Sequence, residues 1–149
     1  MEKITMKKTI ISTSLIAGML LCGTALAAEY EVKMLNKGAD GVFVFEPGFL
    51  KIARGDTVNF LPIDMAHMPK SEVTPDGSSW KGEMNKPFSV TLTEEGVFIY
   101  SCLPHKMLGM VGVIQVGEAV NLAAAKKAAA GIKIAQNKER LDKYLAQVK

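Results

Sequence analysis

Residue types that bind metals are concentrated in one short segment of the sequence. The segment Cys-Leu-Pro-His-Lys-Met-Leu-Gly-Met contains Cys102, His105 and Met110, which offer a thiolate, an imidazole and a thioether within nine residues. This combination suits copper that cycles between Cu(I) and Cu(II) better than it suits zinc or iron. A site of this kind needs a second imidazole, and the chain contains only one other histidine, His67. The candidate metal ligands are therefore His67, Cys102, His105 and Met110.

The beginning of the chain has the composition of a secretory signal peptide. Lysines are followed by a mostly apolar segment, residues 9–21, and then by the small-residue cleavage motif Ala25-Leu26-Ala27. We expect residues 1–27 to be removed, since the apolar segment is short and interrupted for a membrane span. Cys22 leaves a lipid anchor as an alternative, although Leu21 rather than a small residue precedes it.

Charge and cysteine content narrow the function classes. Removing the three lysines and one glutamate of the leader from the net charge of +3 leaves +1, which gives no reason to expect nucleic-acid binding. After cleavage Cys102 is the only cysteine, so no internal disulfide can form. A single thiol in an oxidising compartment is expected to be buried or bound to metal. A small buried hydrophobic side chain is the simpler interpretation of Cys102 alone.

The rest of the sequence predicts a β-sandwich followed by two helices. Short segments rich in β-branched and aromatic residues alternate with Gly and Pro turns, which is typical of a sandwich. The expected strands are residues 29–35, 42–45, 50–52, 57–61, 88–92, 97–102 and 111–116, with a loop-rich segment at 65–86. Helices are expected at 120–130 and 135–148, and an apolar stripe of Leu141, Leu145 and Val148 indicates that the second packs on the sandwich.

This arrangement would bring the candidate ligands together. Cys102 ends one predicted strand and Val111 begins the next, so the loop between them can present Cys102, His105 and Met110 to one point. His67 lies in the loop after the strand 57–61. Loops of a sandwich gather at its two ends, and we expect these two to share one end. Anchoring by strand ends would make the site rigid, which suits electron transfer.

The sequence resembles the cupredoxins and, among them, the pseudoazurins. The resemblance is carried by the residues at 31–38, 44–47, 55–58, 109–113, 115–117 and 136–142, which include Gly109-Met110-Val111-Gly112-Val113 and Glu139-Arg140-Leu141-Asp142. It implies a cupredoxin-type Greek-key β-sandwich with two C-terminal α-helices, formed by residues 28–149 as a plastocyanin-like copper-binding domain. It also implies one type 1 copper ion, with His67, Cys102 and His105 as equatorial ligands and Met110 as the long axial one.

The resemblance further implies a monomeric, diffusible one-electron carrier of the periplasm, with no membrane anchor. The partners it implies are transient redox proteins, namely copper nitrite reductase, nitrous oxide reductase or a c-type cytochrome, in denitrification or related respiration. Pseudoazurins meet acidic partners with a basic ring, for which the candidates here are Lys37, Lys70, Lys81 and Lys106. Apolar side chains around His105, such as Leu108, would allow close approach of the partner.

Two positions beside the ligands depart from the family pattern. Met68 follows His67 where the family commonly has Asn, and Leu103 follows Cys102 where it commonly has Thr. The segment between His67 and Cys102 is also shorter than usual. Met68 and Leu103 are both apolar, so neither leaves a lone buried polar partner behind. No ligand is removed, but we expect the electronic properties of the site to differ.

For other residues near the site, a role in ordinary packing is at least as good an interpretation as a role in function. Met107 competes with Met110 as axial ligand, but the family motif and the position before a strand favour Met110. Met65, Met68 and Met107 suit either packing or contacts with a transient partner. Trp80, the only tryptophan, is expected to pack in the core.

Three classes of function remain to be compared. A one-electron carrier, not an enzyme, is favoured because four protein ligands leave no open metal position and no catalytic triad or carboxylate pair is visible. The alternative is a periplasmic copper-handling protein, a store or chaperone, which would need flexible and exposed ligands. A structural domain with a vestigial site is the third class. Addition of Cu(II) separates them, because only the first would turn blue or green.

Overall fold

The structure is a computed structural model and describes residues 26–149. The predicted signal peptide, residues 1–27, therefore lies outside the described residues except for its last two positions. The elements in chain order are β1 (Glu29–Gly38), β2 (Gly41–Glu46), β3 (Phe49–Ile52), β4 (Thr57–Pro62), β5 (Pro69–Val73), β6 (Phe88–Thr91), β7 (Gly96–Cys102), η1 (Leu103–Leu108), β8 (Val111–Val116), α1 (Leu122–Ala129) and α2 (Glu139–Leu145).

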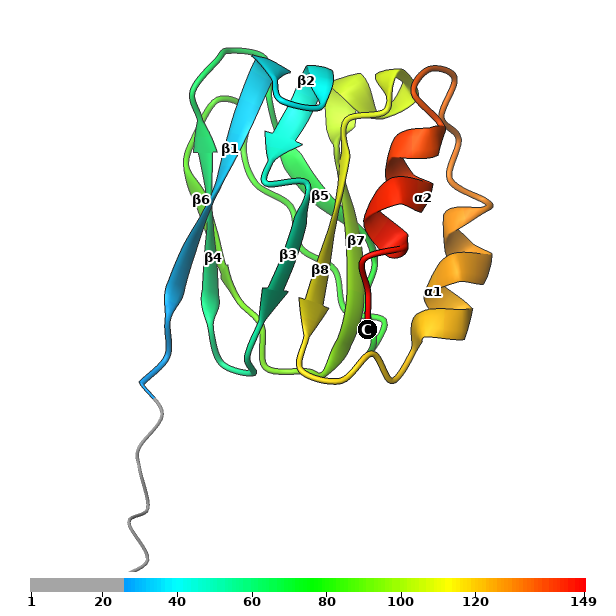
Figure 1. Ribbon diagram of the computed structural model, residues 1–149. Coiled ribbons are helices and arrows are strands. Elements are labelled where there is room, and N and C mark those ends of the chain that lie inside the picture. Colours follow the sequence, from blue (N-terminus) through cyan, green and yellow to red (C-terminus); the bar gives the residue numbers. More distant parts are fainter. Residues whose placement is uncertain (1–25) are drawn as a thin grey trace, which may run out of the picture.

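Two four-stranded sheets face each other and form a β-sandwich, as predicted (Figure 1). The first has the strand order β2-β1-β4-β6 and the second β3-β8-β7-β5. Pairs β1–β4 and β3–β8 are parallel, and the remaining pairs are antiparallel. Alternation explains the first sheet: Val32 and Met34 of β1 and Val58 and Phe60 of β4 point inward and are fully buried.

The central strands of the second sheet are buried on both faces. Every residue of β7 and β8 is buried, because the first sheet covers one face and the two helices cover the other (Figure 1). On the helix side, Ile99 and Val113 pack in a second apolar cluster with Leu141 and Leu145 of α2. The predominance of apolar residues in these two strands thus corresponds to burial on both faces.

Both helices are present but shorter than predicted. α2 begins at Glu139 rather than near Ala135, and the backbone N–H groups of Ala135 and Gln136 donate to the carbonyl of Met107. Asn137 has a positive φ of 52°, which interrupts helical backbone. The predicted stripe is confirmed at Leu141 and Leu145, which are buried against the second sheet.

Two local predictions were wrong. The predicted loop-rich segment 65–86 contains a strand, β5, whose sequence Pro-Lys-Ser-Glu-Val lacks the apolar alternation that predicts a strand. Pro69 begins β5, and proline is tolerated there because β5 is an edge strand. β1 continues through the predicted turn at Asn36 to Gly38, which pairs with Gly41. The predicted loop after Cys102 is present and contains a short 3₁₀ helix, η1.

Among residues 26–149, no helix has the length and apolar character needed to cross a lipid bilayer.

Candidate metal centre

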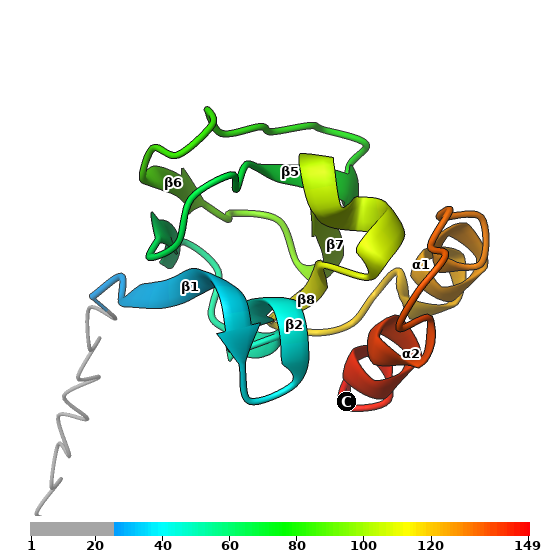
Figure 2. The same ribbon diagram turned by 90° about the horizontal axis from the view of Figure 1, so that it is seen from above.

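Two loops meet at one end of the sandwich, as the sequence predicts. Cys102 is the last residue of β7, and His105 follows in η1. His67 lies in the loop between β4 and β5, and the pairing of Pro69 with Cys102 brings that loop beside the end of β7. In Figure 2 η1 lies over this end, beside the start of β5. Strand pairing therefore positions all three side chains.

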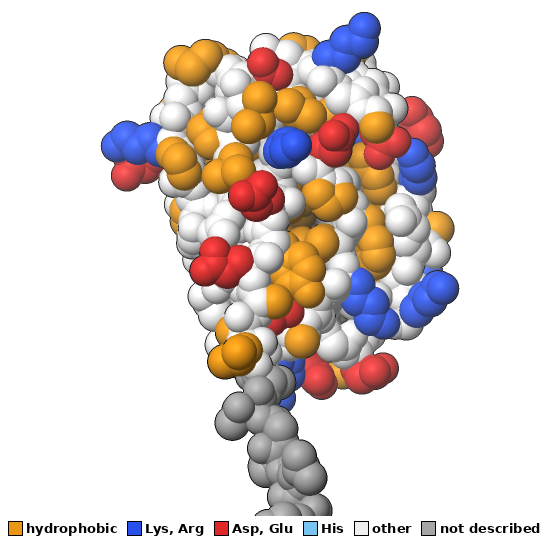
Figure 3. Space-filling model, turned by 60° about the vertical axis from the view of Figure 1, so that its left-hand side comes forward, with side chains coloured by type: hydrophobic (Ala, Val, Ile, Leu, Met, Phe, Trp, Pro, Cys, Tyr) orange, Lys and Arg blue, Asp and Glu red, His pale blue; other side chains and the backbone are white. Residues whose placement is uncertain are grey.

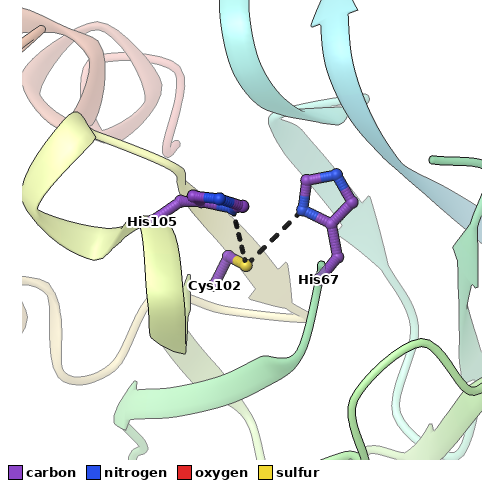
Figure 4. Close-up of side chains that lie close together, drawn as sticks. All are labelled: His67, Cys102 and His105. Atoms are coloured by element: carbon purple, nitrogen blue, oxygen red, sulfur yellow. Dashed lines mark hydrogen bonds between the residues drawn. The ribbon is translucent and has the colours of Figure 1, made fainter. Parts of the chain in front are cut away.

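The three donor atoms converge. His67 Nδ1 lies 3.6 Å from Cys102 Sγ and His105 Nδ1 lies 3.5 Å from it, and all three atoms lie within 4.8 Å of one another (Figure 4). Bonds of about 2.0 Å to nitrogen and 2.3 Å to sulfur, as for zinc, place a nitrogen and a sulfur on one ion within ~4.3 Å. The spacing and the donor set therefore fit one ion, and the His₂Cys set is the one blue copper uses.

Met110 meets the burial requirement for an axial ligand, and Met107 does not. The side chain of Met110 is fully buried, whereas that of Met107 is 50% exposed. The backbone of Met110 is fixed next to the site, since its carbonyl accepts from the N–H of Cys102 at 2.9 Å and its own N–H donates to the carbonyl of His105 at 3.2 Å. Burial therefore favours Met110, in agreement with the sequence prediction.

The backbone of Met68 joins the two ligand loops. Its N–H donates to Cys102 Sγ at 3.4 Å, and its carbonyl accepts from the N–H of Leu103 at 2.9 Å. These bonds use no side chain of Met68 or Leu103. The two departures from the family pattern therefore leave a backbone connection between the loops in place.

Asn85 holds the loop that carries His67, a role that the sequence did not predict. Its Oδ1 accepts from the N–H of Ala66 at 2.5 Å and from that of His67 at 3.2 Å, and its own N–H donates to the His67 carbonyl at 2.9 Å. Ala66 and Asn85 both have positive φ, 70° and 60°. The only sequence signal was the tolerance of asparagine for this conformation, which does not point to His67.

Phe43 is a second unpredicted neighbour of the site. Its ring stacks on the imidazole of His105, with centroids 4.2 Å apart and an interplanar angle of 23°. Phe43 has a positive φ of 48°, which is uncommon for an aromatic residue. The contact orients the face of His105 from β2, the edge strand of the first sheet.

Arg140 of α2 links Phe43 to the ligand loop. The side chain is only 4% exposed, and Nη1 donates to the carbonyls of Phe43 at 2.9 Å and Gly109 at 2.7 Å. Nη2 donates to the carbonyls of Asp40 and Val42 at 3.1 and 3.2 Å. One buried guanidinium therefore connects α2, the β1–β2 turn with β2, and the residue that precedes Met110.

Burial sets the protonation of the ligand groups. It lowers the pKa of His67, with a smaller contribution from neighbouring His105, and it lowers the pKa of His105 itself. Both imidazoles are therefore held neutral, with a lone pair for a metal. Burial raises the pKa of the Cys102 thiol, so metal binding must displace its proton. His67 Nε2 is buried without a hydrogen-bond partner in the described part of the chain.

The surface around His105 is apolar on several sides. His105 is half-buried, while Leu103 and Met107 of η1 and Met65 of the His67 loop are 38%, 50% and 69% exposed. Lys106, the best placed of the predicted basic ring, is paired with Glu72 at 3.2 Å. Its charge is therefore largely offset by a neighbouring carboxylate.

Trp80 packs against the core, as predicted. It is half-buried, with its ring 5.5 Å from that of Phe60 and 5.6 Å from that of Phe88. Its Nε1 is buried without a partner among the described residues. These contacts assign Trp80 to packing between the sheets rather than to the metal centre.

Comparison with known proteins finds copper-binding relatives over most of the chain. Residues 32–117 match the family described as copper binding proteins, plastocyanin/azurin family. The chain is 43% identical over 134 residues to a pseudoazurin of Paracoccus pantotrophus, covering 87% of this chain and 90% of that protein. It is 36% identical over 126 residues to a chloroplastic plastocyanin of Fritillaria agrestis, covering 73% of each.

Solved structures agree with these relatives. The crystal structure of native pseudoazurin from Hyphomicrobium denitrificans superposes with a TM-score of 0.72 at 38% identity, covering 81% of this chain and 98% of that one. The similarity includes most of the described residues, and it confirms the expected cupredoxin fold.

Proposed function

Since the chain belongs to the plastocyanin/azurin family of copper-binding proteins, which are blue copper electron carriers, we propose that it exchanges single electrons with other redox proteins through one type 1 copper ion. His67 Nδ1, Cys102 Sγ and His105 Nδ1 would hold the ion, and the buried side chain of Met110 would add a weak thioether ligand. The observation that carries this proposal is the convergence of the three donor atoms within 4.8 Å at a buried site.

Copper supplies a one-electron couple between Cu(II) and Cu(I) when bound. The protein holds its ligands by backbone bonds that do not depend on the oxidation state, such as the bond from Cys102 N–H to the Met110 carbonyl at 2.9 Å. A site held in this way needs little rearrangement when an electron arrives or leaves. Four protein ligands would fill the coordination sphere and leave no position for a substrate, which supports a carrier rather than an enzyme.

The electron enters and leaves at His105. His67 is fully buried, whereas His105 is half-buried and surrounded by exposed apolar side chains of η1. Apolar contacts bring a partner close and exclude water without forming a permanent complex. The copper-handling alternative is disfavoured because Cys102 and His67, both 0% exposed, cannot transfer Cu(I) without opening the site.

The leader sequence supports export. With the signal peptide 1–27 removed, residues 28–149 function as a monomeric domain in the periplasm, where transient partners are a copper nitrite reductase, nitrous oxide reductase or c-type cytochrome. Mass spectrometry of the protein purified from a periplasmic fraction should give a chain that begins at Ala28. A chain that retains Cys22 with an attached lipid would contradict this.

Copper titration tests the metal site. Protein with Cu(II) should gain intense visible absorption from thiolate-to-copper charge transfer, and one reducing equivalent should bleach it reversibly. Cys102→Ala should bind no coloured copper, and Met107→Leu serves as the matched control that keeps the colour. A coloured Cys102→Ala protein would refute the ligand assignment. A colourless wild type that binds Cu(I) and releases it rapidly to a chelator would instead support copper handling.

A further inference from the structure

An open groove lies between the two C-terminal helices. Its volume is about 870 Å³, and it is lined by α1, α2 and the segment 130–138 that joins them. The floor is apolar, because Leu141 and Leu145 of α2 and Ala129 of α1 are buried there and Ile132 is half-buried. The joining segment reaches the end of the molecule that carries η1 (Figure 1).

The rim of this groove is basic. Lys126, Lys133 and Lys138 line it and are exposed, and none of them takes part in a salt bridge within residues 26–149. Asp142 is the acidic side chain among the lining residues. An apolar floor with three lysines at its edge is complementary to an apolar group flanked by carboxylates.

Positive charge is concentrated in the part of the chain that forms the groove. Residues 118–149 contain seven Lys and Arg against three Asp and Glu, a net charge of +4, whereas residues 28–117 contain eight against eleven, a net charge of −3. On the side of the sandwich that carries β1, acidic and basic side chains are mixed with apolar ones, without a continuous basic surface (Figure 3). The charge distribution therefore directs an acidic partner toward the helices.

The groove also touches the ligand loop. Met107, two positions after His105, lines the groove and is 50% exposed. The Met107 carbonyl accepts from the N–H groups of Ala135 at 2.8 Å and Gln136 at 3.1 Å. An occupant of the groove would therefore contact the same short helix that carries the proposed electron exit.

We infer that this groove is a docking site for an acidic redox partner, which places an apolar side chain flanked by carboxylates between α1 and α2. The inference rests on the proposed electron-carrier function and specifies the chemistry of the partner. The lysines steer the encounter over a distance of about 8 Å at physiological salt. The apolar floor then supplies the contact that salt does not screen, as buried anchors do at protein interfaces.

Electron-transfer rates between the copper-loaded protein and an acidic c-type cytochrome test this site. The groove variant Lys133→Glu/Lys138→Glu is compared with Lys33→Glu/Lys51→Glu, which changes the net charge equally at exposed positions of the sandwich. At low ionic strength the groove variant should reduce the second-order rate constant by about tenfold, and the sandwich variant much less.

A steric variant separates contact from charge. Ala130→Trp fills the groove from an exposed position and should slow transfer to the cytochrome at both low and high salt. All variants should keep the visible absorption and the rate with a small cobalt phenanthroline complex, which needs no docking groove. Failure of the wild type to react with that complex would refute the electron-carrier function itself.

Three results would overturn the docking inference while leaving that function intact. The first is an equal loss of rate in both charge variants, and the second is an unchanged rate in Ala130→Trp. The third is a dimer of the copper protein that Ala130→Trp abolishes, since a second copy would then occupy the groove. A slow groove variant, a slow Ala130→Trp and a monomeric wild type together support it.

Discussion

Replacement of Arg140 should both destabilise the protein and change the surroundings of His105. Arg140→Met keeps a long side chain but removes the guanidinium that donates to the carbonyls of Asp40, Val42, Phe43 and Gly109. Methionine can fill part of the space but donates no hydrogen bond. Besides apolar contacts, α2 would then keep the bonds of Lys143 and Tyr144 to the Asp40 carboxylate. The segment before α2 would keep the bond from Asn137 to the Leu108 carbonyl.

The magnitude follows from the burial of these bonds. The bond to Gly109 is buried, and a hydrogen bond to a charged group contributes roughly 1.5–3 kcal/mol. The other three bonds are partly buried, so water replaces them in part and each contributes less. We expect a loss of about 3–4 kcal/mol in the free energy of unfolding, close to the value for breaking a buried ion pair. In a domain of this size that lowers Tm by roughly 10–15 °C.

Urea and thermal unfolding of copper-free protein, followed by far-UV circular dichroism, measure this loss. Lys143→Met is the matched control on the same helix, because its pair with Asp40 has side chains 60% and 30% exposed and should contribute at most ~1 kcal/mol. The copper-loaded Arg140→Met protein should also show shifted absorption bands, since Phe43 loses its bond to α2 and no longer holds the His105 ring.

Two results would refute this reasoning. If Arg140→Met unfolds within about 1 kcal/mol of the wild type, as Lys143→Met is expected to do, the four bonds contribute far less than their burial indicates. If stability falls but the absorption bands and reduction potential stay unchanged, Arg140 supports the fold without positioning the groups around His105.

Three further predictions follow from the site. Met110→Gln should shift the reduction potential and absorption bands, because the axial ligand tunes a blue copper site; Met107→Gln should leave both nearly unchanged in the same titration, and a shift from Met107→Gln alone would reverse the assignment. Asn85→Ala should lower the free energy of unfolding by about 2–3 kcal/mol in chemical denaturation and weaken copper retention. The positive φ of 60° disfavours alanine by ~1 kcal/mol, and the hydrogen bonds to Oδ1 are lost. Asn85→Gly loses only these hydrogen bonds and should therefore lower the free energy of unfolding less. The pKa of Asp40 is lowered chiefly by its hydrogen bond with Lys143. Its carboxylate therefore stabilises the fold above the unfolded pKa of about 3.9, and this contribution is lost as the pH falls through the lowered pKa of the folded state. Asp40→Asn should flatten the free energy of unfolding against pH in this range, and an unchanged pH dependence would contradict the prediction.

The strands that the sequence predicts well are those whose burial is regular. The apolar run of β8 was predicted with its bounds, and β7 within one residue, because both strands lie between the first sheet and the helices. β5 was missed because it is an edge strand with only five residues, whose sequence carries no alternation. It forms through pairing with β7, a partner far away in the sequence.

The candidate ligands could be named from the sequence, but the residues that support them could not. Cys102, His105 and Met110 lie close in the sequence, and His67 followed from the histidine count. Arg140 donates hydrogen bonds to backbone carbonyls such as that of Phe43, 97 positions away. Every residue has a backbone carbonyl, so residue types in the sequence do not indicate which carbonyl Arg140 will contact. The basic ring stays a prediction, but the salt bridge between Lys106 and Glu72 could not be predicted because it depends on how β5 and η1 lie together.

The position of Arg140 in the chain has a consequence for the time at which the protein can acquire copper. Gly109, whose carbonyl Arg140 binds, precedes it by 31 residues. During synthesis all four proposed ligands therefore emerge well before the helix that secures their loop, and the same order would hold during the proposed export. Copper that arrives at this stage would meet a thiol still open to oxidation and a loop that can still release the ion. We therefore expect stable copper binding to require completion of α2, and a truncation before Arg140 should yield protein that contains every proposed ligand and still loses copper quickly.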